Sequence, residues 1–227
     1  MRNHHLTGGG FLRGNQCGKS LYLNINYPEL DVIQQNKTKD LLLKRKAAAA
    51  LTKHLFPQGK FSGFDVTGSF ELACTLTKKL IDEGTNTIFN ACFSHDNNYC
   101  VIDILHNDHG NWKAYSLWHK DDPFDDTILL GSLQYYITKR CHFEPNDFFA
   151  IEYSTNTDGK NNVSLDYHIS GIKEHIVLMQ DFVDKKIQFF RLLLESGQIP
   201  DVNTGEHCIR PRPCEYHEFC KYSRNSD

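Results

Sequence analysis

Four of the eight cysteines in this chain are placed where they could hold one soft metal centre. Cys208, Cys214 and Cys220 follow one another near the C-terminal end with five residues between neighbours, and Cys17 lies near the start. Because thiolates select zinc or an iron-sulfur cluster over hard cations, the quartet predicts a metal site that ties the two ends of the chain together. Two disulfides, or four unrelated thiols, are the alternatives.

The composition predicts a single globular domain over residues 1–227, since 40% of the residues are hydrophobic and 23% are charged. No apolar run reaches the length of a signal peptide or a membrane span, so a cytoplasmic protein without a membrane partner is expected. Reducing conditions there favour metal-bound or core cysteines over disulfides. The formal net charge of -3 does not indicate a nucleic-acid binder. The other four cysteines are interpreted as core thiols: Cys74, Cys92, Cys100 and Cys141.

Hydrophobic periodicity and turn residues predict an α/β fold with a mixed sheet. A short N-terminal helix is expected to carry Cys17, and the central strands are expected to form an antiparallel meander. The cysteine trio would follow a long amphipathic helix. The expected helices are 37–55, 69–83, 127–140 and 172–195, and the expected strands are 87–94, 99–105, 112–119, 148–154 and 162–169.

Six short segments carry a resemblance that extends from about residue 6 to residue 220: NQCGKSLYL (15–23), YPEL (27–30), TIFNACF (87–93), DIL (103–105), QYY (134–136) and GEHC (205–208). They resemble a bacterial domain family of unknown function in the PD-(D/E)XK, or restriction-endonuclease-like, nuclease superfamily, which includes CRISPR-adaptation exonucleases and recombination helicase-nucleases. The resemblance implies a mixed β-sheet flanked by helices. It also implies that a [4Fe-4S] cluster joins residues 1–35 to residues 200–227, with Cys17, Cys208, Cys214 and Cys220 as ligands. Zinc on the same thiolates stays open from coordination chemistry.

Active members of that superfamily use a strand-borne Asp, a Glu-x-Lys on the next strand and often an earlier Glu. The carboxylates hold Mg²⁺ and the Lys helps to activate water. Asp103 matches the first position, but the resemblance places Ser116 and Trp118 where the Glu and Lys belong, and Asn90 where the earlier Glu is usual. A single carboxylate holds Mg²⁺ weakly. The resemblance therefore implies a degenerate nuclease that binds DNA or a protein partner without acting as an enzyme.

Two other functions stay open. Lys120 lies two residues beyond Trp118, so a continuing strand would present it on the same face, beside Asp103. With a helix-borne carboxylate from Asp121, Asp122, Asp125 or Asp126, these residues could form a migrated site of an active Mg²⁺- or Mn²⁺-dependent DNA exonuclease. Gln134 matches a substrate-contacting helix position in the related nucleases and is the further candidate site residue. The third function is a redox- or metal-sensing interaction protein. The candidate nucleic-acid contacts are Arg210, Arg212 and Tyr136.

Overall fold

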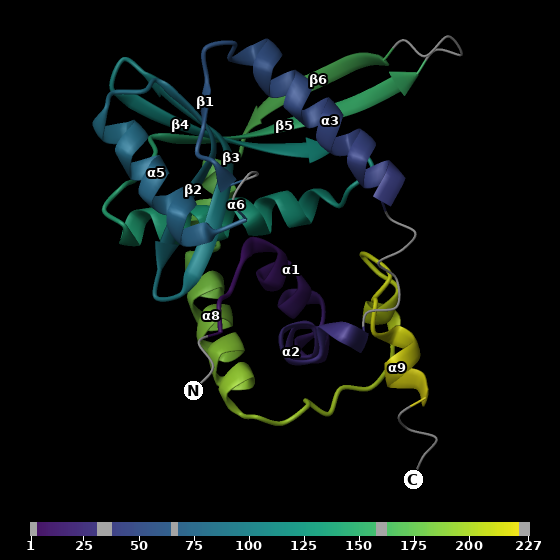
Figure 1. The fold of residues 1–227 in the computed structure, drawn as a ribbon. Helices are drawn as coiled ribbons and strands as arrows, with labels where there is room; N and C mark the ends of the chain where they lie inside the picture. The colour runs from purple at the N-terminus through teal and green to yellow at the C-terminus, as the bar shows by residue number, and fades with distance from the viewer. Residues whose placement is uncertain (1–3, 31–37, 65–67, 158–162, 223–227) are drawn as a thin grey trace.

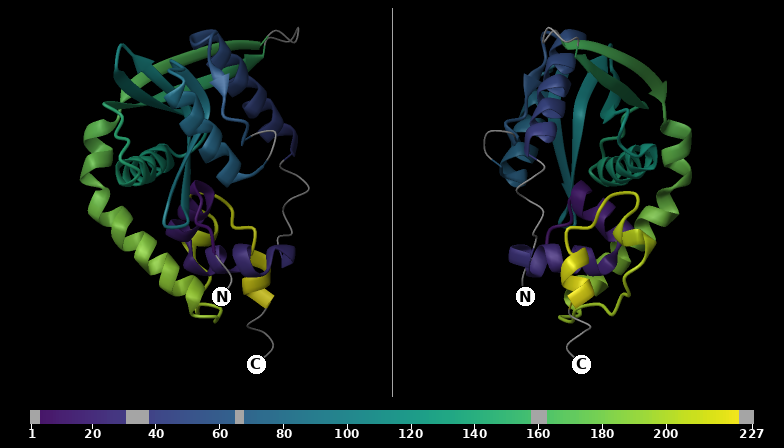
Figure 2. Two further views of the ribbon diagram at one scale, coloured as in Figure 1. Left: turned by 60° about the vertical axis from the view of Figure 1, so that its left-hand side comes forward. Right: turned by 90° about the vertical axis from the view of Figure 1, so that its right-hand side faces the viewer.

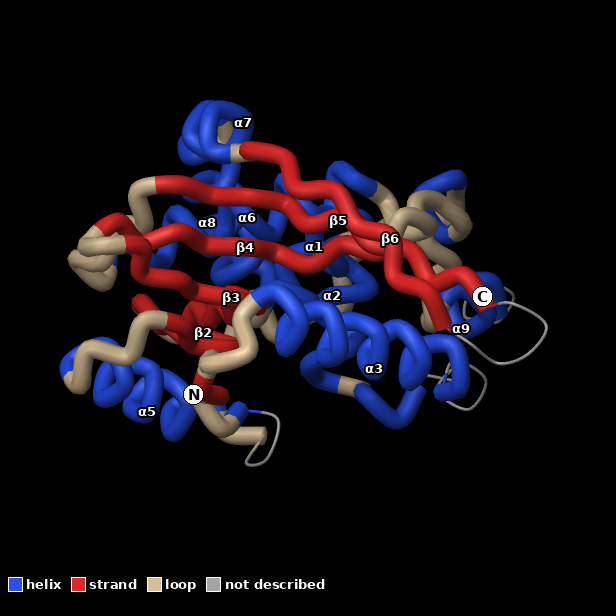
Figure 3. The backbone as a smooth tube through the Cα atoms, turned by 90° about the horizontal axis from the view of Figure 1, so that it is seen from above, coloured by secondary structure: helices blue, strands red, loops and turns tan. Residues whose placement is uncertain are grey.

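A six-stranded mixed sheet forms the centre of the molecule in a computed structural model, which describes residues 4–30, 38–64, 68–157 and 163–222. The strand order follows the chain, from β1 to β6 (Figure 3). β1 with β2, and β4 with β5, are parallel, and the other neighbours are antiparallel. The predicted meander and the later pair of strands are confirmed, whereas β1 was not predicted. The strands are β1 (Lys60–Phe61), β2 (Thr87–His95), β3 (Asn98–Asp108), β4 (Asn111–His119), β5 (Asp147–Thr157) and β6 (Val163–Gly171).

Helices cover both faces of the sheet (Figure 2). Helix α6 (Phe124–Arg140) lies on one face, where the larger hydrophobic core includes Ile88, Ile102 and Leu133. Helix α3 (Thr38–Leu55) lies on the other face, where Leu51 packs with Phe89, Ile104, Ile151 and Tyr153. This arrangement confirms the α/β class and the mixed sheet flanked by helices.

Helix α5 (Phe70–Asp82) shows how local sequence sets an element's ends. The hydroxyl of Ser69 accepts a hydrogen bond from the backbone N–H of Leu72 at 3.3 Å, which caps the first turn. Gly84 follows the helix with a φ of +73°, a backbone conformation that glycine adopts without steric cost. The predicted helix 69–83 matches these bounds to within one residue at each end, so it is confirmed.

Two of the predicted helices are broken in the structure. Cys17 has an extended backbone (φ -159°, ψ 117°) and separates α1 (Gly8–Gln16) from α2 (Gly18–Asn26). The expectation that Cys17 lies within a helix was therefore wrong. Met179 similarly separates α7 (Lys173–Leu178) from α8 (Gln180–Glu195). Each break lets the second helix take a new direction, which periodicity alone does not reveal.

The N-terminal helices α1 and α2 and the C-terminal segment lie below the sheet (Figure 1). After α8 the chain returns past α2 through the short helices η2 (Glu206–Cys208) and α9 (His217–Tyr222). The remaining described helix is η1 (Pro28–Leu30). Leu23 of α2 packs with Cys208, Cys214 and Tyr216 in a separate small core. Among the helices in the described residues, none is both long and apolar enough to span a bilayer.

Candidate functional site

The two central strands stop pairing at Asp103. The register of β3 with β4 runs from Asp108 opposite Asn111 to Ile104 opposite Tyr115. Asp103 is the next residue of β3, and its Oδ2 accepts a hydrogen bond from the backbone N–H of Leu117 on β4 at 2.6 Å. A side-chain carboxylate thus takes a strand N–H that would otherwise enter the ladder, and the strands part at this point.

Strand β2 is irregular at Asn90, beside the same position. Asn90 has a φ of +54°, and it lies between the paired residues Phe89–Ile104 and Ala91–Ile102. On a regular strand, residues two apart point to the same face of the sheet. Here the first pair lies in the core under α3 and the second in the core under α6, so the alternation of side chains is interrupted in both strands. Asn adopts a positive φ more readily than most residues, because its short side chain can hydrogen-bond locally. The local backbone thus explains why Asn suits the place where the resemblance implies a Glu.

Asp103, Ser116 and Gln134 line one cavity, which lies between the sheet and α6. The hydroxyl of Ser116 donates to Oε1 of Gln134 at 3.0 Å, and Nε2 of Gln134 donates to the carbonyl of Val101 at 2.8 Å. Ser116 and Gln134 are 6% and 5% exposed. The structure therefore brings together three of the residues that the sequence marked as site positions, and it joins two of them by a hydrogen bond.

Trp118 and Lys120 lie outside the lining of this cavity. The indole N–H of Trp118 donates to the carbonyl of Asp122 at 2.8 Å, and its ring centre is 5.0 Å from that of Phe124. Lys120 was expected beside Asp103 if the strand continued. Strand β4 ends at His119, so the alternation of side chains does not extend to Lys120. Lys120 is exposed, and its backbone N–H donates to the carbonyl of Tyr153 at 3.0 Å.

The four quartet cysteines all line a second, smaller cavity between α2 and the C-terminal tail, together with Lys19 and His207. All four are present as thiols. Burial raises the pKa of the Cys214 and Cys220 thiols, and the nearby Lys19 acts against this at Cys220. Across the described residues, however, no three His, Cys, Asp or Glu side chains are arranged to hold a metal ion. The structure thus brings the quartet to one cavity, and a metal centre there stays a prediction.

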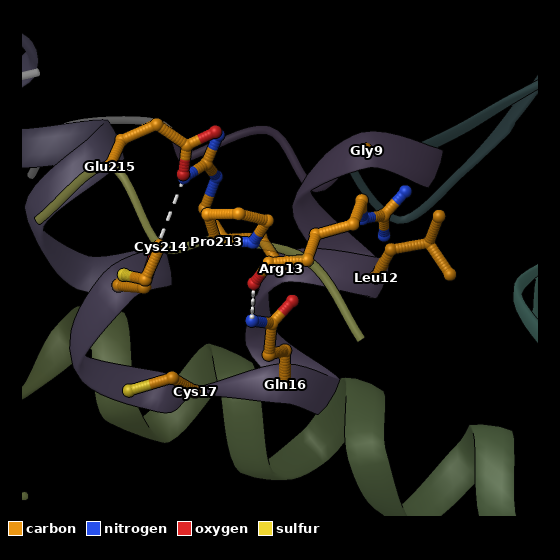
Figure 4. Close-up of a pocket in the computed structure, with 10 residues that line it drawn as sticks. Gly9, Leu12, Arg13, Gln16, Cys17, Pro213, Cys214 and Glu215 are labelled. Carbon is orange, nitrogen blue, oxygen red and sulfur yellow. Dashed lines mark hydrogen bonds and ion pairs between the residues drawn. The ribbon is translucent and has the colours of Figure 1, made fainter. Parts of the chain in front are cut away.

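Polar contacts between the chain ends support this arrangement (Figure 4). Nη1 of Arg13 lies 2.8 Å from Oε2 of Glu215. Nε2 of Gln16 donates to the carbonyls of His207 and Arg212, at 2.8 Å and 2.7 Å. A third cavity, lined by Arg13, Gln16, Arg212 and Glu215, shares Cys17 and Cys214 with the cavity of the quartet. Helix α1 and the tail are therefore joined immediately beside the thiols.

Of the three candidate nucleic-acid contacts, Tyr136 is buried. Its hydroxyl donates to Oδ1 of Asp184 at 2.6 Å, and the guanidinium of Arg140 lies 3.3 Å from its ring centre. Burial, with a contribution from the hydrogen bond to Asp184, raises the pKa of Tyr136 to about 12. Tyr136 therefore joins α6 to α8, and its nucleic-acid contact stays a prediction.

The two candidate arginines each lie near a carboxylate. Nη2 of Arg212 is 3.0 Å from Oδ2 of Asp126, and Nη1 of Arg210 is 3.4 Å from Oε1 of Glu206. Burial raises the pKa of the Asp126 carboxyl, while the charge of Arg212 lowers it. These carboxylates offset part of the positive charge near the cysteines.

No protein-family model matches the chain, and no curated protein matches it. Assignment to a family therefore depends on the motifs in the sequence. The role of the Leu117 N–H as partner of Asp103 was not predicted from the sequence. Nor was the contact between Cys74 and Cys92, because the spacing of the two residues gives no signal of it.

Proposed function

We propose that this protein is a catalytically inactive member of the restriction-endonuclease-like superfamily, which holds a [4Fe-4S] cluster and acts as a binding module. DNA is the partner that the resemblance favours, and a protein partner is the alternative that the test below distinguishes. The observation that carries the proposal is the cavity lined by Asp103, Ser116 and Gln134.

The chemistry of that cavity supports binding rather than cleavage. Asp103 is the single carboxylate among the described residues that line it, and its Oδ2 already accepts the N–H of Leu117. The hydroxyl of Ser116, which stands in the place of the catalytic Glu, donates to Gln134. Metal-dependent hydrolysis needs several hard oxygen ligands and a group that helps to activate water. The described residues of this lining supply one carboxylate and no Lys.

The cavity shared by Cys17, Cys208, Cys214 and Cys220 supports the cluster. A tetrahedral zinc ion, with Zn–S bonds near 2.3 Å, would bring its sulfurs to roughly 3.8 Å from one another. In a four-iron cluster each thiolate binds a different iron, so the sulfurs stay further apart. The described residues contain no group of His, Cys, Asp or Glu side chains arranged to hold a metal ion, so the choice of a cluster over zinc rests on the resemblance. When bound, it would tie α2 to the tail, and its role would be structural.

The proposed inactivity is tested with labelled single- and double-stranded DNA in the presence of Mg²⁺ or Mn²⁺. We expect retention of DNA without degradation, and an affinity that falls as salt rises, because contacts to phosphates release counterions. The matched variant is Asp103→Asn, which keeps an acceptor for the Leu117 N–H. Degradation that this variant abolishes would establish a working nuclease. An absence of DNA binding would leave a protein partner as the ligand.

The proposed cluster is tested on protein purified without oxygen. We expect a brown protein with broad absorbance in the violet and blue, and four irons and four sulfides per chain. Cys208→Ala should lose the colour. Cys141→Ala, which removes a thiol outside the quartet, should keep it. A colourless wild-type protein with one zinc per chain would contradict the cluster.

A further inference from the structure

A second group of thiols lies away from the quartet, where α5 packs against β2. The Sγ atoms of Cys74 on α5 and Cys92 on β2 are 3.3 Å apart. Cys74 is half-buried and Cys92 is only 1% exposed. Both were interpreted as core thiols from the sequence, and this contact makes them a pair.

Helix geometry and one backbone hydrogen bond hold the pair in place. The backbone N–H of Cys92 donates to the hydroxyl oxygen of Thr77 at 2.9 Å. Cys74 and Thr77 are three residues apart on α5, so they lie on one face of the helix. The bond from Cys92 to Thr77 therefore also keeps Cys92 opposite Cys74. A disulfide has an S–S length near 2.05 Å, so closure needs an approach of about 1.3 Å.

The surroundings give the two thiols different reactivity. The hydrogen bond between them lowers the pKa of Cys74, although burial acts in the opposite direction. The same hydrogen bond and burial both raise the pKa of Cys92. Because the thiolate is the nucleophile, Cys74 is the member of the pair that attacks an oxidant. Cys92 keeps its proton at this stage, and its Sγ lies 3.3 Å from that of Cys74. It can attack next as it gives up that proton to the departing hydroxyl group.

We propose that Cys74 and Cys92 form a redox-responsive dithiol, which closes to a disulfide when a hydroperoxide reaches the half-exposed Cys74. The Cys74 thiolate attacks one peroxide oxygen, the O–O bond breaks, and hydroxide leaves to take up a proton as water. The sulfur of Cys92 then attacks the sulfenic acid on Cys74. The S–O bond breaks and a second water leaves with the proton of Cys92. Overall, two thiols and one hydrogen peroxide give one disulfide and two waters.

The two other thiols in this region, Cys100 and Cys141, are less suited to react with a peroxide than Cys74. Cys100 is 2% exposed, and burial raises the pKa of its thiol well above the ordinary value. Cys141 is half-buried, but its Sγ contacts the carbonyl of Ser94 at 3.2 Å, and burial raises its pKa. Cys74 therefore combines access with a lowered pKa. The bridge would fix α5 to β2 two residues after Asn90, and it does not depend on the quartet.

The test uses the full chain, reduced without oxygen and then treated with a small excess of hydrogen peroxide. After free thiols are alkylated, we expect peptide mapping to show one cross-linked species that contains Cys74 and Cys92, is two hydrogens lighter than the reduced peptides, and disappears on treatment with dithiothreitol. Cys74→Ser should abolish that species, and Cys141→Ser should leave it unchanged.

A direct rate measurement keeps the proposal testable if a variant folds poorly. In the untreated wild-type protein at neutral pH, iodoacetamide should label Cys74 several-fold faster than Cys141. The proposal is overturned if Cys74 and Cys92 are alkylated separately after peroxide treatment, if Cys74 is found as sulfinic acid without a bridge, or if it pairs with Cys100 or Cys141. Mapping by peptide separates all these results from oxidation of the quartet cysteines.

Discussion

The carboxylate of Asp103 contributes to the fold itself, whatever ligand the cavity takes. Its Oδ2 accepts the N–H of Leu117 at the place where β3 and β4 part. A buried backbone N–H without a partner costs free energy, so a polar side chain at this position satisfies a structural need. The hydrogen bond to Leu117 thus gives a structural reason for an Asp at this position.

We expect Asp103→Ala to lower the free energy of unfolding by about 2 kcal/mol, because hydrogen bonds to charged groups contribute roughly 1.5–3 kcal/mol. Asp103→Asn should lose less, since its amide oxygen can still accept from Leu117. Urea unfolding of the three proteins measures both differences. Equal stability of wild type and Asp103→Ala would show that the bond to Leu117 contributes nothing.

His106 on β3 predicts a dependence of stability on pH. Its Nδ1 lies 2.8 Å from the hydroxyl of Thr87, and its ring packs 4.8 Å from that of Phe56. Burial lowers the pKa of His106 below its ordinary value of 6.5. As pH falls below 6.5, the unfolded chain therefore takes up this proton before the folded chain, and stability falls until the folded-state pKa is passed.

We expect the free energy of unfolding to fall as the pH is lowered through 6.5, and to fall less in His106→Gln, which lacks the titrating ring. His109→Gln is the matched control, because the side chain of His109 is 99% exposed. Urea unfolding at a series of pH values measures the slopes. Parallel curves for wild type and His106→Gln would contradict the expected contribution.

Among the elements, close packing against α8 determines where helices α1 and α2 lie. A Cβ added at Gly14 of α1 would lie 2.8 Å from the side chains of both Leu21 and Phe190. Phe11 and Phe190, at the same contact, meet edge to face with ring centres 5.8 Å apart. Glycine at position 14 thus lets α1 approach α2 and α8 closely.

Gly14→Ala should therefore reduce stability by about 1–3 kcal/mol, the usual cost of overpacking a core. Gly9→Ala, in the same helix, provides the control: the nearest atom to its added Cβ is 4.0 Å away, so higher helix propensity should raise stability by about 0.5 kcal/mol. Thermal unfolding of both variants measures these opposite effects. A Gly14→Ala protein as stable as Gly9→Ala would contradict the packing argument.

At the scale of the whole molecule, the two chain ends meet in a small core of their own, although Phe11 and Leu21 belong to the larger core beside the sheet. This small core lies around Leu23 and Tyr216, and the bonds of Arg13 and Gln16 join its two segments. A small core stabilises its segment weakly, so a cofactor ligated from both ends would supply much of the remaining stability.

Removal of the proposed cluster by a chelator and oxidant should therefore loosen the ends and leave the sheet folded. Amide hydrogen exchange should rise in 8–26 and 206–222, while β3 and β4 keep their protection. Gln16→Ala should show part of the same increase in 206–222 before any treatment, because it removes two bonds to the tail. Uniform exchange across the chain after cluster loss would show that the ends and the sheet unfold together.

The sequence by itself determined the types and order of most elements, because caps, turns and side-chain alternation act over a few residues. Ser69, Gly84 and the meander of β2, β3 and β4 are examples. Tertiary structure alone decided that Asp103, Ser116 and Gln134 share a cavity, that Lys120 lies outside it and that Cys74 meets Cys92. These outcomes depend on where strands part and how helices pack against them, and such long-range contacts leave no periodic signal in the chain.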